Sequence, residues 1–290
     1  MFSTESTDNK IKKFWPKNGP STHQIKKYID KYSKEKIVIK CGGRVLLDPN
    51  LFDDFIEDIS ILKKIGLTPI VVHGGGPRIK NKLTELNIES TFIGGLRVTD
   101  NKTISIVEEV LIDFNKEIVK ALIAKNCKAC SITTKQSNVI TVKPERKELG
   151  FVGIPEDIKV NTLNQIMERE EVPVLAPMGL DKENKPYNIN ADIAAGAIAK
   201  ALSSRRLLLM TNVEGLYDKT KKLISEITSN KAKNLIEDKT IIGGMIPKIN
   251  TCIDAVKNGV RGVVIIDGRK PHSILNEIFS DKGAGTLIRE

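Results

Sequence analysis

Two hydrophobic patterns alternate along the chain, and each predicts a different kind of element. Short, continuous apolar runs, such as residues 37–40, 69–72 and 207–210, are typical of strands buried on both faces of a sheet. Other segments, such as residues 103–125, place apolar residues three and four positions apart, which indicates amphipathic helices. Strands and helices in alternation predict an α/β fold, with a mostly parallel sheet covered by helices on both faces.

The same patterns give the expected order of elements. We expect helices at residues 51–65, 77–86, 103–125, 163–169, 191–202, 249–258 and 272–279. We expect strands at residues 37–40, 69–72, 131–134, 139–142, 149–153, 172–176, 207–210, 263–266 and 286–288. A chain of 290 residues can bury a large core as one two-lobed unit or as two closely packed domains.

The N-terminal segment differs from the rest of the chain. Residues 1–20 are polar and contain Pro16, Gly19 and Pro20, which predicts a mobile arm. The helix expected next has an apolar stripe made of Ile25, Tyr28, Ile29 and Tyr32. We therefore separate residues 1–35, as arm and helix, from an N-terminal lobe at 36–187 and a C-terminal lobe at 188–290.

The charge of the chain narrows the classes of partner. The 46 Lys and Arg residues exceed the 36 Asp and Glu residues, which gives a net charge of +10. Aromatic residues make up only 4% of the chain, and no basic run is interleaved with them, so we expect no nucleic-acid surface. The excess of lysine would still attract anionic substrates. We find no apolar run long enough to span a membrane and no signal core, so we expect a cytoplasmic protein.

The four cysteines include one CxxC pair, Cys127 and Cys130. No second pair completes a zinc site, and the pair precedes a strand instead of following one, as a thioredoxin-type motif would. We therefore expect reduced thiols near a junction between a helix and a strand.

Two glycine-rich turns follow predicted strands. The first is Lys40-Cys-Gly-Gly43, and the second is Gly74–Gly76, followed by a proline that suits the first turn of a helix. Glycines at the end of a parallel strand let backbone N–H groups approach an anion, and the next helix N-terminus adds partial positive charge. The P-loop and dinucleotide-binding patterns are both absent from the sequence. Tight packing explains the second turn, taken alone, as well as anion binding does.

Further polar residues lie where the predicted elements meet. Arg97 precedes the long helix and has the side chain best suited to bind a carboxylate, although a surface salt bridge is the simpler explanation. Asn188 and Asn190 alternate around an apolar residue, and Asn190 or Asp192 can cap the helix that follows. A third glycine turn leads into the segment that contains Lys248.

Taken together and in this order, these segments resemble the amino-acid kinase family, most closely its acetylglutamate kinases. The resemblance runs from about residue 36 to the end of the chain. The matching elements are Lys40-Cys-Gly-Gly43, Val72-His-Gly-Gly-Gly-Pro77, Gly95-Leu-Arg-Val-Thr-Asp100, Asn188-Ile-Asn-Ala-Asp192, Thr211-Asn-Val-Glu-Gly215 and Gly243-Gly-Met-Ile-Pro-Lys248. The third of these elements points to the acetylglutamate branch. The chain departs from many relatives at Cys41, at Asn212 and in the turn at residues 133–138.

The resemblance implies an open αβα sandwich, with an N-terminal lobe that binds the acyl amino acid and forms a dimer, and a C-terminal lobe that binds ATP. The implied catalytic residues are Lys40 and Lys248, which flank the transferred phosphoryl group, and Asp192, which orients both lysines. The implied substrate-binding residues are Gly75, Gly76, Arg97 and Asn188. The implied nucleotide-binding residues are Gly42, Gly43, Thr211, Gly215 and Gly244.

The implied activity is transfer of a phosphoryl group from ATP to the side-chain carboxylate of N-acetyl-L-glutamate, in arginine biosynthesis. Mg²⁺ would bridge the β- and γ-phosphates, with few protein ligands. Two alternatives stay open: a sister kinase for another acylated acidic amino acid, such as an aminoadipate derivative, and a regulator that binds nucleotide and amino acid without catalysis.

The C-terminal segment is similar to that of arginine-inhibited members of the family. By that resemblance Glu277 would bind arginine, with loop carbonyls near Gly283 completing the site. Such members assemble from dimers into hexamers through an extra N-terminal helix, and the stripe at residues 25–32 is a candidate for that helix. Two alternatives stay open: this helix packs on its own subunit, or Glu277 and the loop at residues 281–285 only close the last helix. Some relatives also bind a PII signalling protein, and the sequence leaves that partner open.

Overall fold

The structure, a computed structural model, describes residues 11–290. Its main sheet contains β1 (Lys36–Cys41), β2 (Thr68–His73), β5 (Ala129–Ile132), β8 (Val172–Leu175), β11 (Arg206–Thr211), β14 (Glu226–Thr228), β15 (Val263–Asp267) and β16 (Gly285–Arg289). These eight strands lie in the order β14-β16-β15-β11-β1-β2-β8-β5. Every neighbouring pair is parallel except β15 with β16. The expected α/β fold with a mostly parallel sheet is confirmed.

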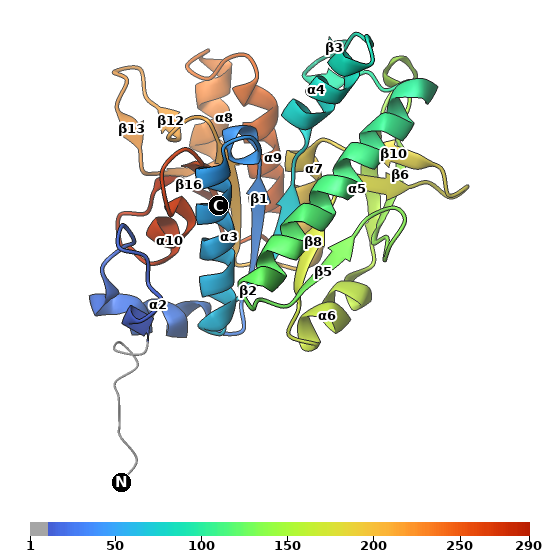
Figure 1. Ribbon diagram of the computed structural model, residues 1–290. Helices are drawn as coiled ribbons and strands as arrows, with labels where there is room; N and C mark the ends of the chain where they lie inside the picture. The colour runs from blue at the N-terminus through green and yellow to red at the C-terminus, as the bar shows by residue number, and fades with distance from the viewer. Residues whose placement is uncertain (1–10) are drawn as a thin grey trace.

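Helices cover both faces of this sheet because its strands are apolar on both sides. One face packs against α3 (Pro49–Lys64), α5 (Asn101–Ala124) and α10 (Ser273–Ile278). The other packs against α6 (Val160–Glu168), α7 (Ala191–Ala201), α8 (Ser229–Glu237) and α9 (Met245–Lys257). Figure 1 shows α3 and α5 in front of the sheet, with α7 and α9 behind it.

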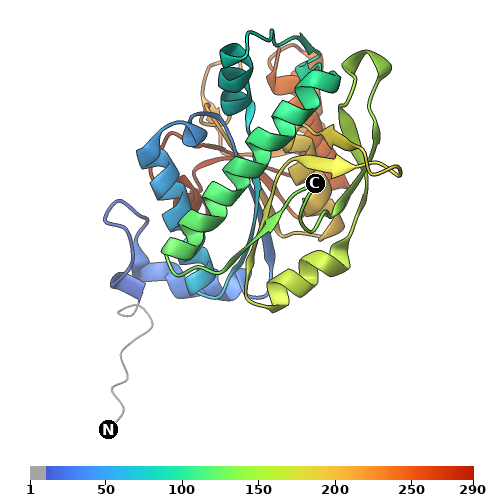
Figure 2. The same cartoon turned by 45° about the vertical axis from the view of Figure 1, so that its right-hand side comes forward.

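The remaining elements surround the main sheet. A second, four-stranded sheet contains β6 (Ile140–Pro144), β7 (Gly153–Ile158), β9 (Met178–Leu180) and β10 (Pro186–Asn188), and Figure 2 brings it forward on the right. Two small hairpins pair β3 (Phe92–Ile93) with β4 (Leu96–Arg97), and β12 (Leu216–Tyr217) with β13 (Leu223–Ile224). The other helices are α2 (Ile25–Tyr32), α4 (Gly76–Glu85) and the short 3₁₀ turns η1 (Thr22–Gln24), η2 (Gly43–Leu46) and η3 (Lys147–Leu149).

The order of strands reflects the order of the chain. The strands that precede residue 188 form one half of the main sheet, and those that follow it form the other half. The halves meet where β1 pairs with β11, in parallel, from Ile37–Arg206 to Lys40–Leu209. Chain connections leave this point in opposite directions, and ligands of open α/β sheets bind at such a crevice.

The expected mobile arm is wrong for residues 11–20. Ile11 is buried, and the Trp15 ring packs edge-on against Phe279 with centroids 5.4 Å apart. The indole N–H of Trp15 donates to the Pro20 carbonyl at 2.8 Å. These apolar side chains hold the segment on the protein in spite of its polar composition. The rest of the expected arm, residues 1–10, lies outside the described residues.

The apolar stripe of α2 also packs on its own chain. Ile25, Tyr28 and Tyr32 are buried, and the Tyr28 hydroxyl donates to Asp281 at 2.6 Å. The Tyr28 ring meets Phe279 edge-on, with centroids 6.2 Å apart. Packing on the same subunit, the alternative left open by the sequence, is therefore confirmed for this stripe.

Several expected elements were misplaced or missed. The strand expected at residues 149–153 is wrong, because η3 ends there in a turn and β7 begins only at Gly153. The Phe151 N–H donates to the Thr99 carbonyl at 2.7 Å, so this backbone bonds to a distant loop rather than to the expected ladder. The sequence did not predict α8, β9, β10 or the strands β12–β14, all of which are three residues long or shorter except α8.

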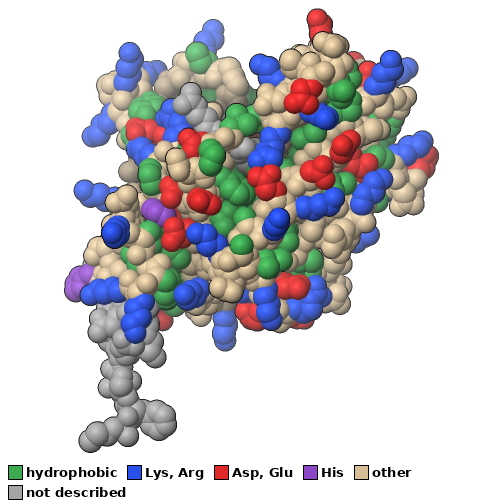
Figure 3. Space-filling view, viewed as in Figure 1, with side chains coloured by type: hydrophobic (Ala, Val, Ile, Leu, Met, Phe, Trp, Pro, Cys, Tyr) green, Lys and Arg blue, Asp and Glu red, His purple; other side chains and the backbone are tan. Residues whose placement is uncertain are grey.

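Charged residues are dispersed over the surface. On the face seen in Figure 3, Lys and Arg side chains lie singly or in small groups, with Asp and Glu between them. Within residues 11–290, no helix combines the length and the apolar character needed to cross a membrane.

Candidate active site

Lys40 lies at the carboxyl end of β1, and the pleat of that strand decides where its side chain points. Val38 packs on the face covered by α7, whereas Ile37 and Ile39 pack on the opposite face. Lys40 follows Val38 by two residues and therefore shares its face. Its Nζ lies 2.9 Å from Oδ1 of Asp192, in the first turn of α7.

A second lysine reaches the same carboxylate. Nζ of Lys248, on α9, lies 2.5 Å from Oδ2 of Asp192, so one carboxylate bridges two ammonium groups. The three side chains are only 11–15% exposed. Burial by itself would raise the pKa of Asp192, but the charges of Lys40 and Lys248 outweigh it and lower that pKa to about 2. The cluster therefore holds an ionised aspartate at neutral pH, with one positive charge in excess.

A glycine turn leads into α9, the helix that carries Lys248. Gly244 precedes α9 and supplies no side-chain cap, but the Ile246 N–H donates to the Gly243 carbonyl at 3.1 Å and Pro247 has no N–H, so the helix start offers few backbone donors to an anion. Gly243 has φ +59°, a left-handed conformation that glycine adopts readily. One cavity is lined by Asn190, Asp192, Gly243, Gly244 and Lys248. Lys248 lines this cavity, and Lys40 pairs with Asp192 on its wall, so two positive charges are available for a phosphate group.

A second cavity adjoins the first. It is lined by Gly75, Gly76, Arg97, Asn188 and Asn190, and both cavities share Gly95, Leu96 and Asn190. Asn188 and Asn190, which alternate around an apolar residue in the sequence, therefore both line this cavity. Asn190 is also the helix cap, because its Oδ1 accepts from the backbone N–H of Asp192 at 2.9 Å.

Arg97 is a buried cation on the wall of this second cavity. Its guanidinium donates to the Ser90 hydroxyl and to the Gly76 carbonyl at 3.4 Å, and stacks 4.7 Å from the Phe92 ring centre. Among the described residues no carboxylate forms an ion pair with it, so the surface salt bridge weighed for Arg97 is wrong. A buried guanidinium without an acidic partner is suited to a carboxylate ligand.

The Gly74–Gly76 turn has both a packing role and open donors. A Cβ on Gly75 would overlap the Leu111 side chain of α5, so this turn packs closely against that helix. Gly76 has open space around it, and Gly75 caps α4 without a side-chain hydrogen bond. Tight packing and anion binding, the two explanations of this turn that the sequence left open, therefore both have support.

His73 is a supporting residue to which sequence reasoning gave no role. It is buried, its Nδ1 lies 2.9 Å from the Gly74 carbonyl, and its Nε2 lies 3.1 Å from Nδ2 of Asn115. Burial lowers the pKa of His73 to about 4, so the ring is neutral at pH 7 and its Nδ1–H donates to Gly74. The only sequence signal for this role is that His73 directly precedes the glycine turn.

The glycines expected near the nucleotide fall into two groups. A Cβ on Gly42 would overlap the Lys40 ammonium, and one on Gly43, with φ +69°, would overlap the Asn212 amide. These residues gather where β1 and β11 end, and Thr211 is the last residue of β11. Gly215 instead packs against Thr286 of β16, which by itself explains the need for glycine there.

Glu277 and Gly283 line a separate cavity between α2 and the C-terminal segment. The Glu277 carboxylate accepts from the Ala284 N–H at 2.7 Å, and burial raises its pKa. The other polar side chains on the wall include those of Lys31, Tyr32, Arg206 and Asp281.

Comparison with known proteins agrees with this geometry. Residues 35–267 match the amino acid kinase family. The chain belongs to this family. It is 59% identical over 275 residues to the acetylglutamate kinase of Pelagibacter ubique, covering 95% of this chain and 96% of that protein. It is 46% identical to the acetylglutamate kinase of Brucella abortus, covering 90% and 93%. It is therefore an enzyme of the acetylglutamate kinase branch.

Solved structures share the fold. N-acetylglutamate synthase from Neisseria gonorrhoeae, complexed with coenzyme A and N-acetyl-glutamate, superposes with a TM-score of 0.84 at 21% identity, covering 92% of this chain and 62% of the synthase. Carbamate kinase from Giardia lamblia bound to AMP-PNP gives a TM-score of 0.66 at 16% identity, covering 88% and 98%. At such low identity these two likenesses establish the fold only.

The cysteines are free thiols. All four are unpaired, with Cys127 between α5 and β5 and Cys130 within β5. Burial raises the pKa of Cys127 to about 11, which keeps its thiol protonated and unreactive at neutral pH.

Proposed function

We propose that the chain transfers the γ-phosphoryl group of ATP to the side-chain carboxylate of N-acetyl-L-glutamate, in arginine biosynthesis. The observation that carries this proposal is the Lys40–Asp192–Lys248 cluster, which lies beside a cavity lined by Arg97, a guanidinium with no acidic partner among the described residues. Its support from outside the structure is the identity with acetylglutamate kinases over nearly the whole chain.

In this proposal the substrate occupies the cavity around Arg97. The guanidinium holds the α-carboxylate in a bidentate pair, and Asn188 bonds the acetylamide. Gly75 and Gly76 direct backbone N–H groups at the γ-carboxylate. That carboxylate is ionised at pH 7, so attack on phosphorus requires no general base.

The two lysines act on the charge of the transferred group. Lys40 and Lys248 flank the phosphoryl oxygens, and Asp192 holds both ammonium groups in place before the substrates arrive. Positions fixed in advance lower the cost of reorganisation during transfer. A regulator without catalysis would gain nothing from two lysines held in this way.

The nucleotide occupies the adjoining side of the cluster. Gly42, Gly43 and Gly244 approach the phosphates, and Thr211 and Gly215 lie toward the nucleoside. Mg²⁺ would enter with ATP and would neutralise part of the charge of its phosphates. The protein contributes few ligands to it, because the one carboxylate of the cluster is already engaged by two lysines. In this proposal the lobe at residues 36–187 binds the acyl amino acid, and the lobe at residues 188–290 binds ATP.

An ATP-dependent hydroxamate assay tests the proposal. Acyl phosphate formation is measured with N-acetylglutamate, glutamate, aspartate and N-acetylaminoadipate as acceptors. We expect turnover with N-acetylglutamate and little with the others. Preference for N-acetylaminoadipate would assign the chain to the sister kinases, and turnover of free glutamate alone would overturn the assignment.

We further propose that arginine inhibits the enzyme by binding in the cavity that contains Glu277 and Gly283. The cavity offers one buried carboxylate for a guanidinium or amino group, and Asp281 supplies a second. Inhibition requires that arginine favour a less active arrangement of the protein. Activity against arginine, compared between the full chain and Glu277→Gln, tests this: inhibition that survives the substitution unchanged would refute it.

The family resemblance implies a homo-oligomer, either dimeric or hexameric, and this assembly is still a prediction. Because the α2 stripe packs on its own chain, an assembly through this helix would have to use its outer, charged face. Light scattering on the full chain and on a chain that starts at Lys34 would show whether the segment affects assembly. A PII partner and the cytoplasmic location likewise stay predictions.

A further inference from the structure

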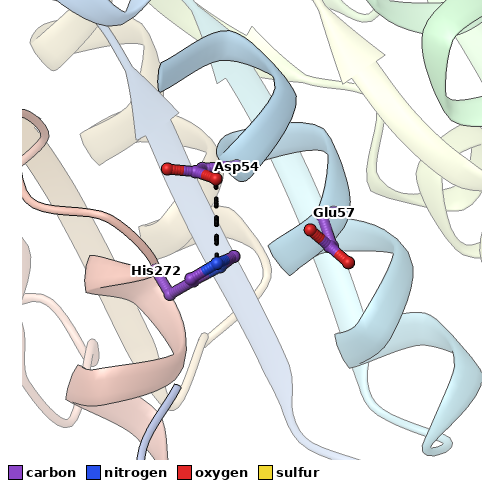
Figure 4. Close-up of side chains that lie close together, drawn as sticks. All are labelled: Asp54, Glu57 and His272. Atoms are coloured by element: carbon purple, nitrogen blue, oxygen red, sulfur yellow. Dashed lines mark ion pairs between the residues drawn. The ribbon is translucent and has the colours of Figure 1, made fainter. Parts of the chain in front are cut away.

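Three potential metal ligands converge at the junction of α3 and α10, away from the substrate cavities. Asp54 and Glu57 come from α3, and His272 from the residue just before α10. One ligand atom of each lies within 4.8 Å of the others. Figure 4 shows the Asp54 carboxylate facing the His272 ring, at 3.7 Å from its Nε2.

The helix geometry explains how two of these groups share a face. Asp54 and Glu57 are three residues apart in α3, and residues at this spacing are neighbours on a helix surface. Both are partly exposed, so their carboxylates can turn without disturbing the core. His272 is only 7% exposed, so its ring position is fixed by packing.

A buried carboxylate orients the histidine from behind. Oδ1 of Asp58 lies 2.7 Å from Nδ1 of His272, and Asp58 is itself buried. With Nδ1 bonded to Asp58, Nε2 is the ring nitrogen that faces Asp54 and is placed to bind a metal ion. Metal-binding histidines are commonly held in this way, with the second ring nitrogen bonded to a carboxylate. Among the described residues no hydrogen bond engages Nε2, since Asp54 lies beyond bonding distance.

We propose that Asp54, Glu57 and His272 form a binding site for a divalent transition metal ion such as Zn²⁺. One imidazole nitrogen and two carboxylates suit Zn²⁺, which prefers nitrogen, sulfur and oxygen ligands at about 2.0–2.2 Å for nitrogen and oxygen. Ca²⁺ and Mg²⁺ prefer sites made of oxygen ligands alone. Rotation of the Asp54 and Glu57 side chains would bring their carboxylate oxygens to bonding distance of an ion held by His272.

The bound ion would join segments that are distant in sequence. It would fix α3, which follows the Gly42–Gly43 turn, to the start of α10, which carries Glu277. The site is independent of the phosphoryl-transfer cluster, so it can be tested without nucleotide or substrate.

Calorimetric titration of the chelator-treated full chain with ZnCl₂ tests the proposal. We expect one site per chain in the wild type, and binding weakened by at least about tenfold in Asp54→Asn and in Glu57→Gln. Asp53→Asn is the matched control, because it removes the same charge from an exposed neighbour on the same helix and should bind as the wild type does. MgCl₂ in excess should not compete.

Cobalt distinguishes this site from the cysteines. Co²⁺ bound by nitrogen and oxygen ligands lacks the intense thiolate charge-transfer absorption that Cys127 or Cys130 would give. Binding that disappears in Cys130→Ser but persists in Asp54→Asn and Glu57→Gln would overturn the proposal. So would a wild type that takes up no Zn²⁺, because Asp54, Glu57 and His272 would then form an ion-pair cluster only.

Discussion

Replacing Asp192 with asparagine tests the electrostatics of the proposed catalytic cluster directly. The substitution keeps the size of the side chain and its first-turn position, but leaves the ammonium groups of Lys40 and Lys248 without their shared counter-ion. Removing one partner from a buried ion pair is costly, because the remaining charge stays desolvated. We therefore expect Asp192→Asn to fold but to lose stability.

The expected magnitude follows from the pKa of Asp192. That pKa is lowered from its ordinary value of 3.8 to about 2. At about 1.4 kcal/mol per pKa unit, the ionised carboxylate contributes roughly 2–3 kcal/mol to the free energy of unfolding. Because the folded pKa is depressed, this contribution is fully present at neutral pH and is lost as the pH falls from about 4 toward about 2.

Urea unfolding at pH 7 and at pH 5 measures this difference. We expect Asp192→Asn to be less stable than the wild type by roughly 2–3 kcal/mol at both values. Asp254→Asn is the control, because it removes an exposed aspartate from a similar pair with Lys200, and should cost less than about 1 kcal/mol. Equal losses in the two variants, or a difference that changes between pH 5 and pH 7, would refute the reasoning.

Three further substitutions test separate parts of the site. Lys248→Ala should lower kcat by roughly 10²-fold with a smaller change in the KM for ATP, because the charge it meets grows during transfer; steady-state kinetics with an unchanged kcat would remove the lysine from the proposed mechanism. Arg97→Ala should raise the KM for N-acetylglutamate by roughly 10- to 100-fold and leave that for ATP unchanged, since the carboxylate contact is present before and during transfer. An equal rise in both constants would contradict a role confined to the substrate. Gly75→Ala should lower activity, because the added Cβ overlaps Leu111 and shifts a turn that lines the substrate cavity, and adding Leu111→Ala should recover part of that activity. A double variant no more active than Gly75→Ala would mean that the overlap is not the cause.

Local patterns predicted the regular elements well where one physical preference dominated. The long helix was expected at residues 103–125 and begins at Asn101, and Asp100 caps it by accepting from the Thr103 N–H at 2.8 Å. The buried strands β2 and β11 each lie within two residues of their expected limits. Continuous apolar runs and capping residues act within a few positions of the chain, so the sequence alone reveals them.

Elements that depend on distant contacts were harder to predict. Residues 11–20 have the composition of a mobile arm, yet Trp15 is held by Phe279 from the far end of the chain. The short strands β9 and β10 pair with each other around a turn and have too few residues for a periodic signal. In both cases the stabilising partner is absent from the local window that a sequence pattern samples.

The sequence by itself determined the α/β fold, the two glycine turns and the residue types suited to phosphoryl transfer. Only the family resemblance implied that Asp192 contacts both Lys40 and Lys248, which lie more than 200 positions apart, because no local pattern could determine it. Nor could a local pattern reveal that Arg97 has no acidic partner within residues 11–290, or that Asp58 lies behind the His272 ring. The fold class follows from short-range periodicity. The partner of a charged side chain depends instead on which ends of strands and which first turns of helices lie together in the folded protein. Only the packed sheet, through the pairing of β1 with β11 and the seating of α7 against them, decides that.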